Sequence, residues 1–103
     1  MLPAVGREKG MNDQEIGLLL SDLEALAHDQ VPELSDELDR IGEIVDRLAK
    51  TRRAQTQNYL YQHLKQLELY LQTIHGRLKP VPGLDCRAHA LVIIDGLRGP
   101  HGL

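Results

Sequence analysis

Leucine and isoleucine recur at regular intervals in the segment YLYQHLKQLELYLQTIHGRLKP, residues 59–80. Successive positions are separated by four and three residues in alternation. Side chains three and four residues apart lie on the same side of an α-helix, so this spacing predicts an amphipathic helix with one apolar stripe. The stripe consists of Leu60, Leu64, Leu67, Leu71, Ile74 and Leu78.

A second stripe with the same alternation precedes it, formed by Leu34, Leu38, Ile41, Val45 and Leu48. Between residues 33 and 75 there is no proline, and Gly42 is the only glycine, so the usual signals of a turn are absent. Leu60 follows Leu48 by 12 residues, which displaces the two stripes by roughly 80° around a straight helix. Two interpretations remain: one continuous helix over residues 33–77, which the missing turn residues favour, or a hairpin broken near residues 50–55.

An earlier helix is predicted over residues 12–29, with Asn12 or Asp13 as its N-cap and Glu15 in its first turn. Its apolar face is Ile16, Leu19, Leu23 and Leu26, widened by Leu18 and Leu20. Val31 precedes Pro32 and is pushed out of helical conformations, so we expect this helix to end near residue 30.

Prolines and glycines separate the long helical region from the end of the chain. Residues 80–103 are predicted to form a linker, a short helix and a loose tail, with Asp85 capping that helix and Gly96 closing it. A face of Leu84, Ala88, Leu91 and either Ile94 or Asp95 is expected for the helix, and a strand is the alternative because Leu91–Ile94 is short and partly β-branched. Residues 1–11 are expected to be a flexible leader, and residues 12–79 a helical core, in one all-α domain.

The apolar stripes are too large to be left in water. Burying six leucine or isoleucine side chains contributes about 9–18 kcal/mol gross, comparable to the whole net stability of a small domain. A continuous helix over residues 33–77 would be about 67 Å long, twice the diameter of a compact globule of this size. For that helix the other segments are too short to cover both stripes, so a second copy is required, whereas a hairpin lets three or four helices close a small bundle alone. Over both interpretations we expect a homodimeric helical bundle with coiled-coil-like seams built from both stripes.

Charge is divided unevenly along the chain. Residues 1–46 hold twelve acids and three bases, a balance of −9, whereas residues 47–103 hold three acids and nine bases, a balance of +6. Antiparallel contact between two copies would place an acidic arm beside a basic one. Exposed ion pairs contribute little affinity, but they disfavour the parallel arrangement.

Catalytic and metal-binding patterns are weak. Cys86 and His89 form a C-x-x-H pair, but two more zinc ligands would have to come from distant parts of the chain. The sequence has no glycine-rich phosphate loop and no Ser/His/Asp arrangement, and it lacks Trp and Phe. We therefore expect no enzymatic activity, no metal and no cofactor. The single cysteine fits a reducing compartment.

These observations predict a small cytoplasmic regulator or adaptor that sequesters, inhibits or assembles a partner protein. No apolar run approaches the roughly 20 residues of a membrane span. Among the three tyrosines, Tyr61 points away from the leucine stripe and is a candidate anchor for a partner. The alternative function is nucleic-acid binding by the basic half of the chain, whose densest cluster is Arg47, Lys50, Arg52 and Arg53.

Overall fold

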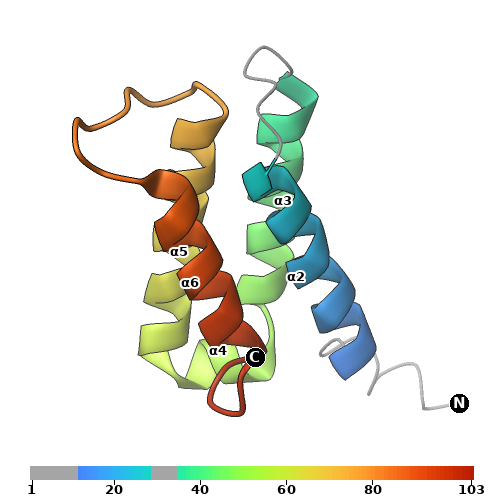
Figure 1. The fold of residues 1–103 in the computed structure, drawn as a ribbon. Coiled ribbons are helices and arrows are strands. Elements are labelled where there is room, and N and C mark those ends of the chain that lie inside the picture. The colour runs from blue at the N-terminus through green and yellow to red at the C-terminus, as the bar shows by residue number, and fades with distance from the viewer. Residues whose placement is uncertain (1–11, 29–34) are drawn as a thin grey trace, which may run out of the picture.

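The computed structural model describes residues 12–28 and 35–103, and within them the chain forms five α-helices and no strand. The helices are α2 (Asp13–His28), α3 (Ser35–Ala49), α4 (Arg52–Thr56), α5 (Asn58–Ile74) and α6 (Cys86–Arg98). The four longer helices run alternately up and down as an antiparallel bundle, with the short α4 across one end (Figure 1). Helix α3 packs on α5, α5 on α6, α6 on α2, and α2 on α3. The all-α fold class is confirmed.

A turn between α3 and α5 makes the prediction of one continuous helix over residues 33–77 wrong. Thr51 produces this turn without glycine or proline. Its backbone is extended, and its hydroxyl donates to the carbonyl oxygen of Leu48 at 2.8 Å. The Thr51 hydroxyl oxygen Oγ1 also accepts a hydrogen bond from the Ala54 amide at 3.4 Å. Threonine is a favoured N-cap, so it starts α4. Gln57, also extended, then separates α4 from α5. The alternative interpretation, a hairpin broken near residues 50–55, is the one observed.

The hairpin places both leucine stripes in one core. Seven of the predicted dimer-interface residues are buried within the single chain: Ile41, Val45, Leu48, Leu60, Leu64, Leu67 and Leu71. Leu38 and Ile74 are partly buried against this core, Leu78 is exposed, and Leu34 lies outside the described residues. The assignment of the stripes to an intersubunit seam is therefore wrong for the buried positions. Folding back at Thr51 lets each stripe cover the other, so no second copy is needed to cover them.

Helix α2 begins as the sequence indicates. The Asn12 side chain accepts a hydrogen bond from the Glu15 amide at 2.8 Å, and the Asn12 amide donates to Glu15 Oε1 at 3.3 Å. This reciprocal pair is a capping box. On the apolar face Ile16, Leu20, Leu23, Leu26 and Ala27 are buried and Leu19 is half-buried, whereas Leu18 is 61% exposed. The predicted flexible leader, residues 1–11, lies outside the described residues.

Helix α6 is a helix rather than the alternative strand, and Asp85 caps it by accepting from the Ala88 amide at 3.1 Å. Its buried face differs from the prediction and consists of Cys86, Ala90, Ile94 and Leu97. The helix also continues past Gly96 to Arg98. Helix α6 packs against both α2 and α5, and these contacts select the buried face. The small Ala90 side chain is fully buried between these helices and allows them to pack closely. The predicted face would not be covered by both neighbours.

The end of the chain is attached to the bundle, so the prediction of a loose tail is wrong. The Leu103 amide donates to the carbonyl oxygen of Leu97 at 2.9 Å, and the Leu103 side chain packs against the core. The Tyr59 hydroxyl donates to the carbonyl oxygen of His101 at 2.9 Å. These contacts fix the tail across the same end of the bundle as α4.

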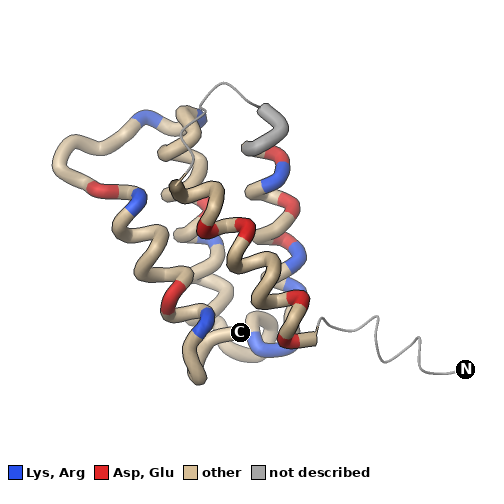
Figure 2. Tube along the Cα trace, turned by 45° about the vertical axis from the view of Figure 1, so that its right-hand side comes forward, with Lys and Arg blue, Asp and Glu red and all other residues tan. Residues whose placement is uncertain are grey.

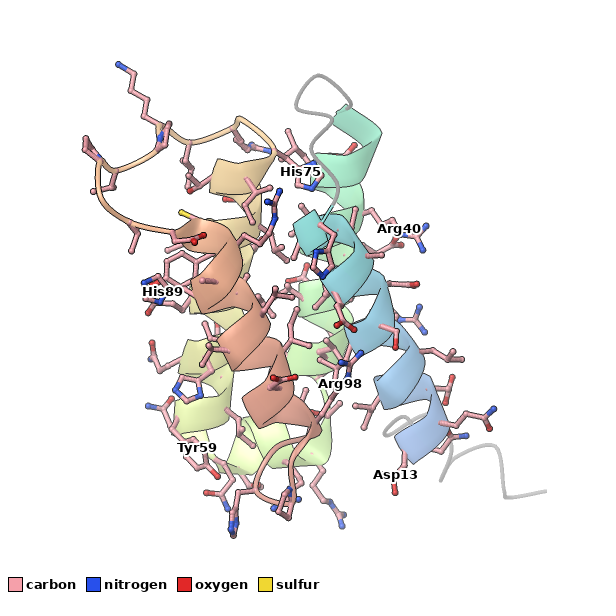
Figure 3. All side chains as sticks on the ribbon, in the orientation of Figure 1. Asp13, Arg40, Tyr59, His75, His89 and Arg98 are labelled. Carbon is pink, nitrogen blue, oxygen red and sulfur yellow. The ribbon has the colours of Figure 1, made fainter. Side chains whose placement is uncertain are left out.

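Two side chains complete the C-terminal end of α2, where the last carbonyl groups have no partner within the helix. His75 is fully buried after α5, and its Nε2 donates to the carbonyl oxygen of Leu26 at 2.7 Å (Figure 3). Arg87 Nε donates to the carbonyl oxygen of Ala27 at 2.8 Å. Helix α2 is thereby tied to both α5 and α6.

Ion pairs add contacts at the surface. Asp22 pairs with Arg40 of α3 at 3.0 Å, and Glu24 pairs with Arg98 of α6 at 2.8 Å, so α2 is linked on both sides (Figure 3). The hydrogen bond from Lys65 to Glu68 raises the pKa of Lys65. The exposed pairs each contribute about 0–1 kcal/mol, so the apolar core dominates stability. None of the helices in the described ranges is long and apolar enough to cross a membrane.

Candidate protein-binding surface

Exposed apolar side chains are concentrated on one side of the bundle. Within the described ranges, the large apolar residues that remain exposed on α5, α6 and the loop joining them are Tyr59, Tyr61, Leu69, Leu78, Val81 and Val92. The only other one is Leu18 on α2. The layer formed by α5 and α6 therefore carries most of the apolar surface that the core leaves uncovered.

Charged residues are denser on the α2–α3 layer (Figure 2). Helix α2 holds four acids and no lysine or arginine, and residues 38–49 of α3 hold three acids and two arginines. The 17 residues of α5 include only Lys65 and Glu68 as charged residues, and the 13 residues of α6 include Arg87, Asp95 and Arg98. The α2–α3 layer is thus net acidic, whereas α5 and α6 together hold three bases and two acids.

The outer side of this layer can be defined from helix geometry and contacts. On α5, Glu68 lies 3.7 Å from the Cβ position of Gly42 and so faces α3, while Tyr70 stacks on His89 of α6. On α6, Arg87 and Arg98 reach towards α2. From the exposed and half-buried positions between these sides we define the α5–α6 face as Tyr59, Gln62, His63, Gln66, Leu69, Tyr70, His89, Val92, Ile93 and Gly96. Two charged residues border this face: Lys65, one turn before Leu69 on α5, and the exposed Asp95, one turn after Val92 on α6.

Two tyrosine–histidine pairs order this face. The rings of Tyr70 and His89 stack with centroids 5.3 Å apart and an interplanar angle of 19°, and Gln66 Nε2 donates to the Tyr70 hydroxyl at 3.2 Å. Tyr59 meets His63 edge-on at 6.0 Å, and its hydroxyl is held by the tail. His89 and Tyr59 project from the same side of the molecule, away from α2 (Figure 3). The aromatic rings are therefore positioned before any partner binds.

Val92 and Gly96 give the face its relief. Val92 is 69% exposed, which makes it the most exposed large apolar residue in the described ranges. Gly96 lies one helical turn further on, and a Cβ added there would meet no atom within 4 Å. The Val92 side chain therefore projects from the surface, and one turn later the backbone at Gly96 is not covered by any side chain.

The structure separates the predicted partner-binding residues into two places. Tyr61 is exposed on α5 near Lys65, at the edge that faces α3 rather than on the α5–α6 face. The basic cluster is exposed at the turn between α3 and α4, and we call it the basic corner: Arg47, Lys50, Arg52 and Arg53. In the part of the chain that the structure describes, none of these four residues forms an ion pair.

The basic corner adjoins one end of the α5–α6 face. Arg53 donates to the carbonyl oxygen of Pro100 at 3.4 Å, and Tyr59 donates to that of His101. Both surfaces therefore contact neighbouring residues of the tail. A ligand that extends beyond the α5–α6 face at this end would reach the arginines.

A hollow of about 510 Å³ lies at the other end, between the end of α5, the following loop and the start of α6. Its lining is Thr73, Ile74, Pro80, Gly83, Leu84, Asp85, Cys86 and Arg87. The thiol of Cys86 is almost fully buried, while His89 turns away towards Tyr70, so the C-x-x-H pair does not converge. Among the side chains of residues 12–28 and 38–103, no group of three or more His, Cys, Asp or Glu is placed to hold a metal ion.

Sequence reasoning missed most of the α5–α6 face. Leu69, His89 and Val92 carry no individual signal, although the scarcity of charge along α5 is visible in the sequence and could have indicated a contact surface.

The chain matches no protein-family model, no curated protein and no solved structure.

Proposed function

We propose that this protein is a non-enzymatic interaction module, a small cytoplasmic regulator or adaptor that binds a partner protein through the α5–α6 face. One observation carries the proposal: Tyr59, Leu69 and Val92 expose apolar surface on this face, and its two helices carry fewer charged residues than α2 and α3. Single exposed apolar side chains are ordinary on protein surfaces. A surface that combines exposed apolar side chains, ordered tyrosines and few charges resembles the core of a protein–protein interface.

The face also defines the chemistry of its partner. Its centre offers no side-chain charge, and Lys65 and Asp95 lie at its margins, so a charged group buried at the centre would lose its hydration without gaining a counterion. His63, His89, Gln62 and Gln66 offer hydrogen bonds to neutral polar groups. We therefore expect the bound surface to be apolar at its centre and neutral polar at its margins, as on one side of an amphipathic helix or a helix pair.

Preorganisation supports binding rather than packing as the role of the tyrosines. Tyr59 and Tyr70 are already held by hydrogen bonds and ring contacts, so little side-chain freedom is lost when a partner covers them. Tyr70 also packs against the core, whereas Tyr59 is exposed. Binding would serve to sequester, inhibit or assemble the partner.

The test is capture of proteins from the native host by the full chain and by three variants. Val92→Glu and Leu69→Glu place a charge on the α5–α6 face, and Leu18→Glu is the matched control because Leu18 is similarly exposed on α2. We expect a protein that wild type and Leu18→Glu retain and that both face variants lose. A partner retained equally by all four proteins would exclude this face as its binding surface.

A second candidate function, binding of nucleic acid, is favoured by the basic corner. Arg52 and Arg53 are the first two residues of α4, where the positive end of the helix disfavours cations. Their placement is therefore not explained by helix stability. Affinity for DNA and RNA should fall steeply as salt rises, and Arg52→Glu with Arg53→Glu should remove it, with Leu69→Glu as the control. No binding at low salt would exclude this function.

A further inference from the structure

We infer that the basic corner binds single-stranded nucleic acid, with phosphates on its arginines and lysine and one base stacked on Tyr59. The inference rests on the second candidate function proposed above, and it names the form of nucleic acid and the residue that holds a base. The site lies at the end of the bundle that α4 and the tail cross (Figure 1).

Positive charge dominates the two segments that form this end of the bundle. Residues 47–63 contain the four bases of the basic corner and no acid, and residues 96–103 contain Arg98 and no acid. Acids lie at the margins, namely Asp46, Asp95, and Asp13 and Glu15 at the start of α2. Asp13 projects on the opposite side of this end from Tyr59 (Figure 3). Within the described part of the chain none of these acids pairs with the basic corner, so its four charges remain for an anionic ligand.

The tail holds Tyr59 beside the basic corner. Arg53 Nη1 donates to the carbonyl oxygen of Pro100 at 3.4 Å. The Tyr59 hydroxyl donates to the carbonyl oxygen of His101 at 2.9 Å. Pro100 and His101 are consecutive, with Cα atoms about 3.8 Å apart, so the guanidinium group and the phenol ring are neighbours. A strand whose phosphate contacts Arg53 therefore has the ring of Tyr59 beside its next base.

The ring of Tyr59 can stack on a base. Tyr59 is 47% exposed, and the His63 ring meets it at 81° with centroids 6.0 Å apart. Rings that are nearly perpendicular meet edge to face, so this contact covers at most one face of the Tyr59 ring. Stacking on an aromatic side chain accepts any base, because every base has a π-face.

The geometry favours a single strand over a duplex or an acidic peptide. Proteins that read a duplex insert a helix or a β-ribbon into its major groove. Helix α4 has five residues and is about 7.5 Å long, so it is too short for this role. An acidic peptide would pair with the arginines but would offer Tyr59 no base to stack on. Gln55, Gln57 and Asn58, exposed between the basic corner and Tyr59, add neutral hydrogen-bonding groups for bases and sugars.

Fluorescence anisotropy of the full chain with a labelled oligothymidylate tests the inference. A strand of about 15 nucleotides matches the longer sites of small single-strand-binding folds. At physiological salt the dissociation constant should lie at about 1–100 μM. Four phosphate contacts give a slope of about −2.8 for log affinity against log salt, so affinity should fall roughly 50-fold between 50 and 200 mM salt. A duplex of the same length should bind more weakly.

Two sets of variants separate charge from stacking, each checked for folding by circular dichroism. Arg52→Gln with Arg53→Gln should halve the salt slope to about −1.4. Arg77→Gln with Lys79→Gln removes the same charge from the loop at the other end of the bundle and should bind like wild type (Figure 1). Tyr59→Leu should weaken binding at least about fivefold and leave the slope unchanged, because the ring is uncharged. Tyr59→Phe loses the same bond to the tail but keeps the ring, so it should bind like wild type.

Other outcomes would overturn the inference. Tighter binding of the duplex, or unchanged affinity of Tyr59→Leu, would mean that only phosphates are bound; the inference then fails while the second candidate function stands. A polyglutamate peptide of the same charge that binds as tightly as the single strand would assign the basic corner to acidic protein segments, and the inference fails. If the single strand and the duplex both fail to bind at low salt, the inference and the second candidate function fail together.

Discussion

Replacing Leu67 by alanine tests the central feature of the fold, the packing of the α5 stripe inside its own chain. Leu67 is fully buried within a cluster to which α2, α3, α5 and α6 all contribute. Leucine-to-alanine changes at such sites cost about 2–5 kcal/mol, because apolar contact is lost and a cavity remains. We expect about 3 kcal/mol here, a large part of the roughly 5–15 kcal/mol that stabilises a small domain. The melting temperature should fall by about 10–20 °C.

The assay is urea unfolding followed by far-UV circular dichroism, which reports the helices of a chain without tryptophan. It is carried out at two protein concentrations that differ about a hundredfold. Because Leu67 packs within one chain, the loss in unfolding free energy should be the same at both concentrations. A residue in an intersubunit seam would instead lose stability only where the dimer forms.

Leu69→Ala is the matched control, since it is the same chemical change two positions along the same helix at a side chain that is 52% exposed. It should cost no more than about 0.5 kcal/mol. Equal losses for the two variants, a loss below about 1 kcal/mol for Leu67→Ala, or a loss that disappears on dilution would each contradict the burial of the stripe in its own bundle.

Three further substitutions test separate features, each by thermal unfolding or hydrogen exchange. Gly42→Ala should stabilise the protein by up to about 1 kcal/mol, because the added methyl meets only Glu68 Oε2 at 3.7 Å and alanine is the better helix former; a destabilised variant would mean that α3 and α5 pack more closely than described. Thr51→Ala should cost about 1 kcal/mol and Thr51→Ser much less, since serine keeps the capping hydroxyl; equal effects would remove the cap as the cause of the turn. Gly102→Ala should detach the tail, because a Cβ there would overlap the carbonyl group of Leu97, and the Leu103 amide should then exchange faster; unchanged exchange would show that the tail is not held.

Much of the fold follows from the sequence alone. The alternation of three and four residues identified the buried sides of α2, α3 and α5, and Asn12 and Asp85 identified two helix starts. These features are local, because a helix and its cap are determined by residues within one or two turns of each other. The all-α class therefore needed no knowledge of the neighbours.

Tertiary structure decided what each stripe packs against. Thr51 can continue a helix or cap one, and it caps because folding back there buries Leu48 against the stripe of α5. The buried side of α6 was also determined by distant parts of the chain. Its apolar residues occupy several positions around the helix, so more than one face could have been buried. Only the contact with both α2 and α5 determined which of them was covered.

The α5–α6 face likewise exists only in three dimensions. Tyr70 and His89 are separated by a proline- and glycine-containing loop, and they stack because α5 and α6 lie side by side. Residues on either helix are unremarkable by themselves, and the α5–α6 face appears only when the two helices pack together. An apolar stripe in a sequence shows that some surface must be covered, but the covering surface is determined by the free energy of the whole packed chain.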